Sequence, residues 1–77
     1  MGRNQHVVSQ GERWAVTAEG APQPSGVFKT QSEAWEKAKA IARRERSEAI
    51  LYGRNGLVRV RSSYGYDPPR SKTLGKV

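Results

Sequence analysis

Cysteine is absent from this 77-residue sequence, and His6 is its one histidine. Disulfides, thiolate chemistry and the common structural zinc sites all require cysteine, so none of them is open to the chain. A single histidine cannot form a metal cluster by itself, and we therefore expect no metal and no cofactor. Stability must come from packing.

Long apolar runs are missing as well. No stretch approaches the roughly 18 residues that a membrane-spanning helix needs, and the first six residues lack the apolar segment of a signal peptide. We therefore expect a cytoplasmic protein that does not enter a membrane. One histidine and seven dispersed acidic residues also give little material for a catalytic pocket, so we predict no enzyme activity and no catalytic residue.

Positive charge is what the sequence has in excess. Its 14 lysines and arginines against 7 acidic residues give a formal charge of +7. So dense a charge on a chain that fits one small domain attracts polyanions through its long-range field. DNA or RNA is therefore the first class of partner to consider.

Two hairpins are predicted on either side of a helix. Residues 6–9 and 13–17 are predicted to form two strands joined by a turn, with Trp14 and Val16 on one face of the second strand. A loop rich in proline and glycine follows at 19–26, and Val27–Lys29 is a short extended segment. The second hairpin pairs 48–52 with 57–61 around Asn55-Gly56, a dipeptide favoured in tight turns.

The helix is predicted from Gln31 to about Arg46. Thr30 and Glu33 have the spacing of a capping box, in which each side chain satisfies a free backbone N–H at the start of a helix. Apolar residues then recur every three or four positions and form one stripe. These residues are Ala34, Trp35, Ala38, Ile41 and Ala42.

The fold class that follows is α+β in the order ββ-α-ββ, with a short extra strand before the helix. We expect an antiparallel sheet of two hairpins with the helix packed on one face. Residues 1–62 form the single domain, and residues 63–77 form a turn and a flexible basic tail. The predicted core consists of Val8, Trp14, Val16, Trp35, Ala38, Ile41, Ala42, Ile50, Val58 and Val60.

Several short motifs occur in an order that is typical of one protein family. They are His6-Val7-Val8, Trp14-Ala15-Val16, Thr30-Gln31-Ser32-Glu33-Ala34, Tyr52-Gly53-Arg54-Asn55-Gly56 and Ser63-Tyr64-Gly65-Tyr66-Asp67-Pro68. Over about residues 5–69 the chain resembles the small bacterial domain-of-unknown-function family 2188. The resemblance implies a bacterial or phage source and a ββαββ-type fold, and it carries no catalytic residue. The segment 70–77 departs from the family pattern.

Two groups of basic residues are candidates for phosphate contacts, because the planar guanidinium group can donate two hydrogen bonds at once. The first group is expected on the sheet face away from the helix and consists of Arg13, Arg54, Arg59 and Arg61. The second is a helix strip made of Lys39, Arg43 and Arg46. Both also have structural interpretations: alternating arginines protect an edge strand, and glutamates interrupt the helix strip.

Two functions therefore remain open. The first is a non-enzymatic nucleic-acid-binding module that contacts phosphates. The second is a protein-interaction module, a small dimer or an accessory subunit, that uses a strand edge or the open sheet face around Ala15, Thr17 and Leu57. A continuous positive patch on the second face of the sheet favours the first function, and an apolar patch favours the second.

Overall fold

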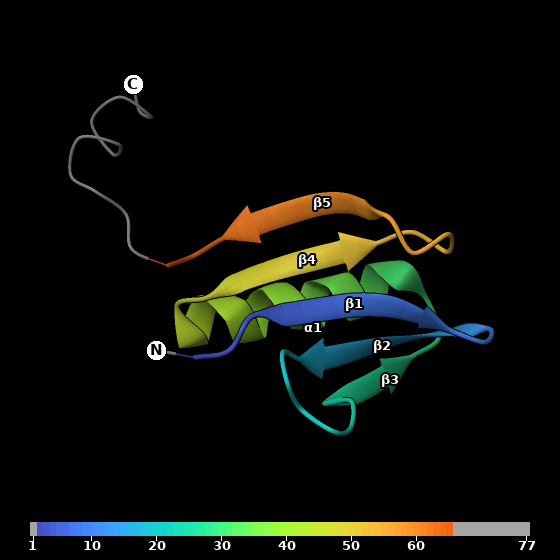
Figure 1. The fold of residues 1–77 in the computed structure, drawn as a ribbon, viewed down its shortest axis with the longest axis horizontal. Coiled ribbons are helices and arrows are strands. Elements are labelled where there is room, and N and C mark those ends of the chain that lie inside the picture. Colours follow the sequence, from blue (N-terminus) through green and yellow to red (C-terminus); the bar gives the residue numbers. More distant parts are fainter. Residues whose placement is uncertain (1, 66–77) are drawn as a thin grey trace.

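Five strands and one helix follow one another in the predicted order in the computed structural model, which describes residues 2–65 (Figure 1). Of the predicted turn and tail, residues 63–77, only 63–65 are described, where Ser63 ends the last strand and Tyr64 packs against the core; residues 66–77 lie outside the described residues. The elements are β1 (Gln5–Gln10), β2 (Arg13–Ala18), β3 (Gly26–Phe28), α1 (Gln31–Glu45), β4 (Glu48–Tyr52) and β5 (Val58–Ser63). The predicted α+β class is confirmed.

The helix begins where the capping signal predicts. The backbone N–H of Glu33 donates to Oγ1 of Thr30 at 3.1 Å, which satisfies one of the free donors of the first turn. The last helical residue is Glu45, one residue before the predicted end, because Arg46 adopts the left-handed conformation with φ 58°. The stripe of Ala34, Ala38, Ile41 and Ala42 is buried against the sheet.

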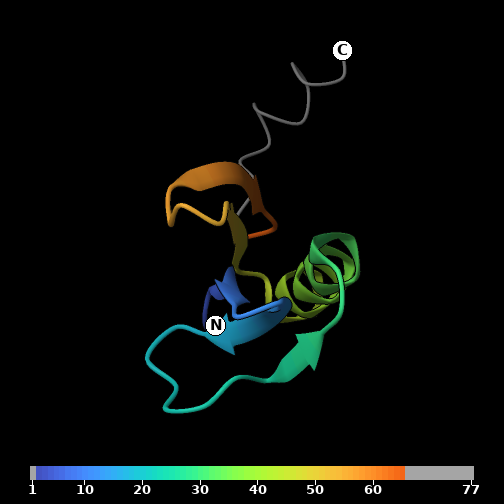
Figure 2. The same ribbon diagram turned by 90° about the vertical axis from the view of Figure 1, so that its right-hand side faces the viewer.

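The sheet is mixed, so the prediction of an antiparallel sheet is wrong at its centre. The strand order is β3-β2-β1-β4-β5, and β1 pairs with β4 in parallel. The helix explains the difference. It carries the chain back along the sheet after β3, so that β4 starts at the same end as β3 and runs in the same direction as β3 and β1. Figure 2 shows α1 on one side of the sheet only.

The faces of β1 are also the reverse of those predicted. Val7 pairs with Val16 and Leu51 and is completely buried on the side of the helix, whereas the predicted core residue Val8 points to the other side. Alternation makes this an all-or-none choice, because a shift of one residue exchanges the two faces of a strand. The core cluster is Val7, Trp14, Val16, Ala34, Ala38, Ile41, Ala42, Ala49 and Leu51, with Phe28, Trp35 and Tyr64 packed against it.

The edge strand β5 departs from the predicted core most clearly. Val58 and Val60 are 50% and 41% exposed, so neither is a core residue. The register of β4 and β5 shifts beside Tyr52: Leu51 pairs with Val60, but Tyr52 pairs with Val58, which leaves Arg59 as an extra residue. Such a bulge turns the side chains that flank it to opposite faces of the sheet.

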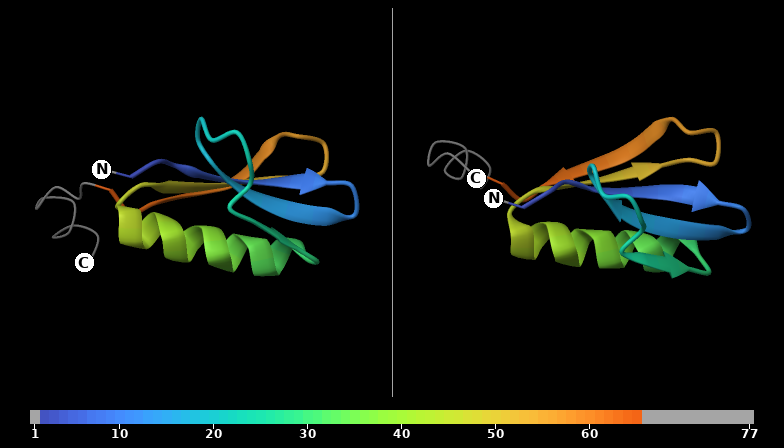
Figure 3. Two further views of the ribbon diagram at one scale, coloured as in Figure 1. Left: turned by 90° about the horizontal axis from the view of Figure 1, so that it is seen from below. Right: turned by 60° about the horizontal axis from the view of Figure 1, so that its bottom comes forward.

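Both ends of the described chain meet at one end of the sheet. The N–H of Gly2 donates to the carbonyl oxygen of Glu45, and the N–H of Tyr64 donates to that of Ser47. The turns of the two hairpins lie at the opposite end, as Figure 1 shows, because β1 and β4 are parallel. The connection between β2 and β3 rises on the side away from α1 (Figure 3).

Candidate interaction surface

The predicted basic sheet face does not form as one surface. Arg61 pairs with Glu48 across the sheet, at 3.7 Å between Nη1 and Oε1. Arg59 is directed towards the helix instead, where its Nη1 donates to Oε1 of Gln31 at 3.2 Å. The prediction that Arg59 and Arg61 share one face is therefore wrong, and the bulge in β5 is the physical reason.

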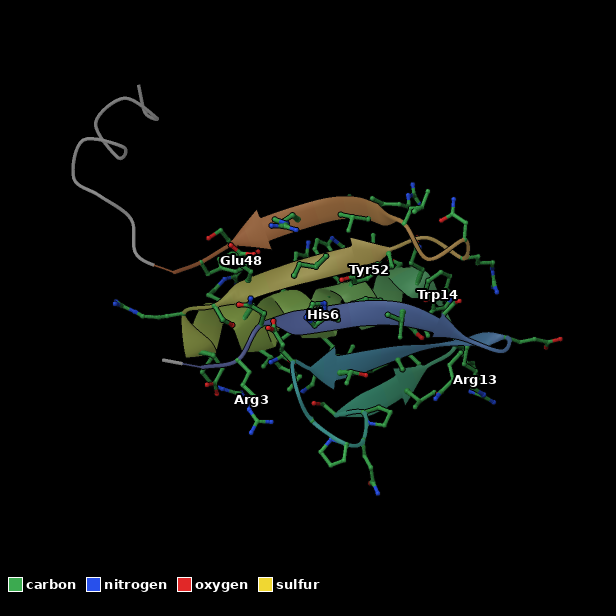
Figure 4. The ribbon with its side chains drawn as sticks, in the orientation of Figure 1. Arg3, His6, Arg13, Trp14, Glu48 and Tyr52 are labelled. Carbon is green, nitrogen blue, oxygen red and sulfur yellow. The ribbon has the colours of Figure 1, made fainter. Side chains whose placement is uncertain are left out.

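Arg13 and Arg54 lie at the end of the sheet that carries the two hairpin turns. Arg54 closes over the ring of Trp14, with its guanidinium carbon 5.1 Å from the ring centroid, and its Nη1 donates to the carbonyl oxygen of Gly11 at 3.3 Å. Arg54 thus links the two turns. Arg13 is exposed at the start of β2, as Figure 4 shows.

The helix strip is on the other side of the molecule from Arg13 and Arg61. Lys39 pairs with Glu36 at 3.0 Å and lies 5.5 Å from the ring centroid of Trp35. Arg43 lies over the ring of Tyr64 at 5.3 Å, and Arg46 ends the helix. The seven predicted binding residues are therefore spread over the helix, the open face and the turn end, and most of them contact neighbouring side chains.

The open face of the sheet, which is the side away from α1, carries a continuous row of apolar side chains. The register places Val27 beside Ala15, Ala15 beside Val8, and Tyr52 beside Val58. Continuing the parallel register by one residue places Val8 beside Tyr52. The apolar row therefore crosses all five strands: Val27, Ala15, Val8, Tyr52 and Val58.

The exposure of the apolar row rises from its middle to its ends. Ala15 is only 1% exposed, although no helix covers it, because it sits between the larger side chains of Val8 and Val27. Val27 at one end is 46% exposed, and Val58 at the other is 50% exposed. The row is an apolar patch with a filled centre and two half-exposed ends.

Next to the apolar row, three side chains from distant parts of the sequence form a hydrogen-bonded chain. Nδ1 of His6 lies 3.0 Å from the hydroxyl oxygen of Tyr52, and Nε2 lies 3.3 Å from Oε1 of Glu19. A carboxylate only accepts, so Nε2–H of His6 donates to Glu19, while Nδ1 shares a hydrogen bond with the hydroxyl group of Tyr52. Figure 4 shows His6 and Tyr52 side by side on β1 and β4. These two hydrogen bonds hold the His6 ring between Glu19 and Tyr52 and orient the Tyr52 hydroxyl group.

Sequence reasoning missed both features for identifiable reasons. It placed Val8 in the core, so the row could not be seen. It also had no means to bring Glu19 and Tyr52 to His6, from which they are 13 and 46 residues away in the chain. Val27 was expected in an extended segment, but only the pairing of β3 with β2 shows that it extends the row.

Metal and membrane features were both expected to be absent. Within residues 2–65, no three histidine, aspartate or glutamate side chains come together as metal ligands would. The described part of the chain also contains no helix long and apolar enough to cross a membrane.

Comparison with known proteins agrees with the resemblance seen in the sequence. Residues 5–64 match the family described as "Uncharacterized protein conserved in bacteria (DUF2188)". The chain is 40% identical over 58 residues to "Uncharacterized protein YdaT" of Bacillus subtilis (strain 168). The match covers 75% of this chain but only 39% of that relative. No solved structure matches the chain. The chain therefore belongs to the bacterial family DUF2188, to which its sequence motifs pointed.

Proposed function

We propose that the chain is a protein-interaction module whose open sheet face binds an acidic partner that presents apolar side chains. The observation that carries this proposal is the apolar row, which crosses the whole sheet and ends in two half-exposed valines. Scattered exposed hydrophobic residues are normal on a protein surface, but a contiguous row on a sheet face that no helix covers is typical of a binding surface.

The partner gains free energy by covering the ends of the row. Burying a fully exposed valine contributes about 1.5 to 3 kcal/mol, so covering what remains exposed of Val58 contributes about 1 kcal/mol. Val27 has nearly the same exposed fraction and contributes a similar amount. Tyr52 adds an aromatic ring and a hydroxyl group to the centre of the surface, a combination that is enriched at protein interfaces.

Charge selects an acidic partner. Arg13 flanks the row towards the hairpin turns, and Arg61, opposite Ile50, flanks it on the other side. The Arg61 side chain is 58% exposed and its contact with Glu48 is long at 3.7 Å, so its guanidinium group can also bind a partner's carboxylate. A second copy of a chain with a charge of +7 would be repelled, whereas an acidic surface would be attracted.

Nucleic acid fits this face less well, although the net charge attracts it. Phosphate binding needs several guanidinium or ammonium groups along one surface. Here Arg59 bonds to the helix, Arg54 covers Trp14, and Arg13 and Arg61 stand on opposite sides of an apolar strip. Valine side chains at the centre of the surface offer phosphate no hydrogen bond.

The test is an NMR titration of the full isotope-labelled chain with a synthetic peptide in which valine and glutamate alternate. We expect the backbone signals of Val8, Ala15, Val27, Tyr52 and Val58 to move together. Three further probes are titrated alongside: a valine–lysine peptide, a serine–glutamate peptide and a single-stranded oligonucleotide. The valine–glutamate peptide should bind most tightly.

Two matched variants locate the surface. Val58→Ser should weaken peptide binding about fivefold, which corresponds to the roughly 1 kcal/mol estimated above. Val60→Ser removes a valine of similar exposure from the other face of the same strand and should leave binding unchanged. If the serine–glutamate peptide binds equally well, charge alone is responsible and the proposal is wrong. It is equally wrong if the oligonucleotide binds more tightly than either acidic peptide.

A further inference from the structure

A second surface feature lies on the other side of the sheet, near the C-terminal end of α1. It is an open hollow of about 490 Å³ between the start of β1, the end of β2 and the last turns of the helix. Its lining consists of Gly2, Arg3, Gln5, Ala18, Ser25, Ile41, Arg44 and Glu45. None of these residues belongs to the apolar row, so the hollow is separate from the proposed docking surface.

Gln5 is the most unusual residue of the lining. Its side chain comes from the helix-facing side of β1, and the residue is only 3% exposed. Its Nε2 donates to the carbonyl oxygen of Arg3 at 2.9 Å, but its Oε1 has no hydrogen-bond partner. Exchanging the two amide atoms would place two acceptors against each other and leave a donor unpaired. In either orientation, a buried polar atom lacks a partner, at a cost of about 1 to 3 kcal/mol.

The charged groups around the hollow have both signs. Arg3 and Arg44 provide two guanidinium groups, and Glu45 provides a carboxylate. The Arg44–Glu45 contact of 3.9 Å is long, and Arg44 is largely exposed, so the pair is weak and both groups can bind other charges. The carbonyl groups of the last helical turn add negative potential close to Glu45.

Gly2 holds this arrangement in place. Its N–H donates to the carbonyl oxygen of Glu45, and a Cβ at this position would overlap the Glu45 side chain. The close contact of backbone and side chain fixes the chain just before Arg3. Arg3 therefore starts from a defined position at the rim of the hollow, where Figure 4 shows its side chain below the start of β1.

From these groups we infer that the hollow binds an α-amino-acid unit, that is, a carboxylate whose adjacent carbon carries an N–H donor. The carboxylate pairs with Arg3 and Arg44. The N–H group faces the carboxylate of Glu45 and, after a small shift of the buried Gln5 side chain at the wall of the hollow, donates to its unpaired Oε1. Ile41 and Ala18 accept a small apolar side chain. A free amino acid and the C-terminus of a polypeptide both supply this chemistry.

The chemistry of the ligand follows from the mixed charges. A simple anion would bind the arginines but would be repelled by Glu45 and by the helix end. A simple amine would leave the arginines without a partner. A ligand with both a carboxylate and an N–H donor pairs with the arginines and with Glu45, and it also gives the buried Oε1 of Gln5 a partner. Charge-assisted hydrogen bonds of this kind are roughly twice as strong as neutral ones.

The test is a titration of the full isotope-labelled chain with L-valine, monitored by NMR. We expect the signals of Arg3, Gln5, Ala18 and Ile41 to move, with a dissociation constant on the order of 1 mM for so small a ligand. Isovalerate lacks the ammonium group and isobutylamine lacks the carboxylate. Each should bind about tenfold more weakly, because each loses a charge-assisted interaction.

A fourth compound, N-acetyl-L-valine, distinguishes the two sources. It keeps the carboxylate and the N–H group but carries no positive charge, as at the end of a polypeptide. If it binds more tightly than L-valine, the hollow recognises a polypeptide C-terminus; if it binds more weakly, the ligand is a free amino acid. If isovalerate binds as tightly as L-valine, or if L-valine moves no signal of the lining, the inference is wrong.

Variants separate ligand binding from structural effects. Gln5→Leu removes the unpaired acceptor and should weaken L-valine binding about tenfold; because it also removes the hydrogen bond from Nε2 to the carbonyl oxygen of Arg3, its urea midpoint is measured alongside. Arg3→Gln should weaken binding by a similar factor. Arg13→Gln, an exposed arginine outside the hollow, should have no effect, and neither should Val58→Ser. A lower urea midpoint for Gln5→Leu with unchanged binding would assign Gln5 a structural role only.

Discussion

Adjacent valines in β1 provide a direct test of the register of the central strand. Val7 is completely buried between Val16 and Leu51 on the helix side, whereas Val8 lies half-buried on the open face. The two residues have the same chemistry and the same strand propensity. The difference in stability between the two alanine variants therefore reports the surroundings of each valine.

The expected costs follow from the methyl groups removed. Val7→Ala deletes two fully buried methyl groups, at about 0.8 kcal/mol each, and leaves a cavity that the packed helix cannot fill, so we expect a loss of about 2 to 3 kcal/mol. Val8→Ala deletes groups that are already partly solvated and leaves no closed cavity, so we expect a loss of about 1 kcal/mol or less. The two values should differ by about 1.5 kcal/mol.

Urea and thermal unfolding, followed by circular dichroism, can resolve this difference. A domain of this size has a total stability of about 3 to 10 kcal/mol, of which Val7→Ala removes a large part. Its melting temperature should fall by about 10 to 20 °C, and that of Val8→Ala by less than about 8 °C. Val60→Ala, on the exposed edge strand, should behave like Val8→Ala. If Val8→Ala is as destabilising as Val7→Ala, the faces of β1 are assigned wrongly and the apolar row does not exist.

Three smaller predictions concern the helix ends and the hairpin turns. Thr30→Ala removes the acceptor for the N–H of Glu33 and should cost about 1 kcal/mol in urea unfolding, whereas Thr30→Ser should cost little. Arg46→Gly should raise the melting temperature by a few degrees, because glycine adopts the left-handed conformation without the penalty of roughly 1 kcal/mol that a side chain carries; a decrease would contradict this. Arg54→Ala uncovers Trp14 and should increase acrylamide quenching of tryptophan fluorescence, whereas the Arg13→Ala control should not.

The parts of the fold that local sequence determines were predicted correctly. Thr30 marks the start of the helix, the apolar spacing marks its buried stripe, and Asn55-Gly56 marks the turn of the second hairpin. Each of these signals acts over a few residues, so a sequence pattern is sufficient to find it.

The errors all concern relations between distant segments. Val7 and Val8 are chemically identical, so only the pairing with β4 decides which of them enters the core. The direction of β4 relative to β1 depends on the path of the helix, which no single strand pattern encodes. The bulge at Arg59 leaves a regular Val-Arg-Val-Arg alternation in the sequence but breaks it in space.

The candidate site was harder to predict for the same reason. Arginine side chains are long, and their partners here come from far along the chain: Gly11 is 43 residues from Arg54, and Gln31 is 28 residues from Arg59. Composition predicted the amount of positive charge but not its distribution. To predict the apolar row, one would have to know the pairings of all five strands at once.

The first and last described residues lie at one end of the sheet, where Gly2 bonds to Glu45 and Tyr64 bonds to Ser47, and this limits how residues 2–65 can be joined to other sequence. A polypeptide that enters and leaves through one end can carry this domain without spanning it, in the way that an inserted domain interrupts its host. Within residues 2–65, both points at which the chain continues lie at the end of the sheet with the hollow, away from the two hairpin turns (Figure 1).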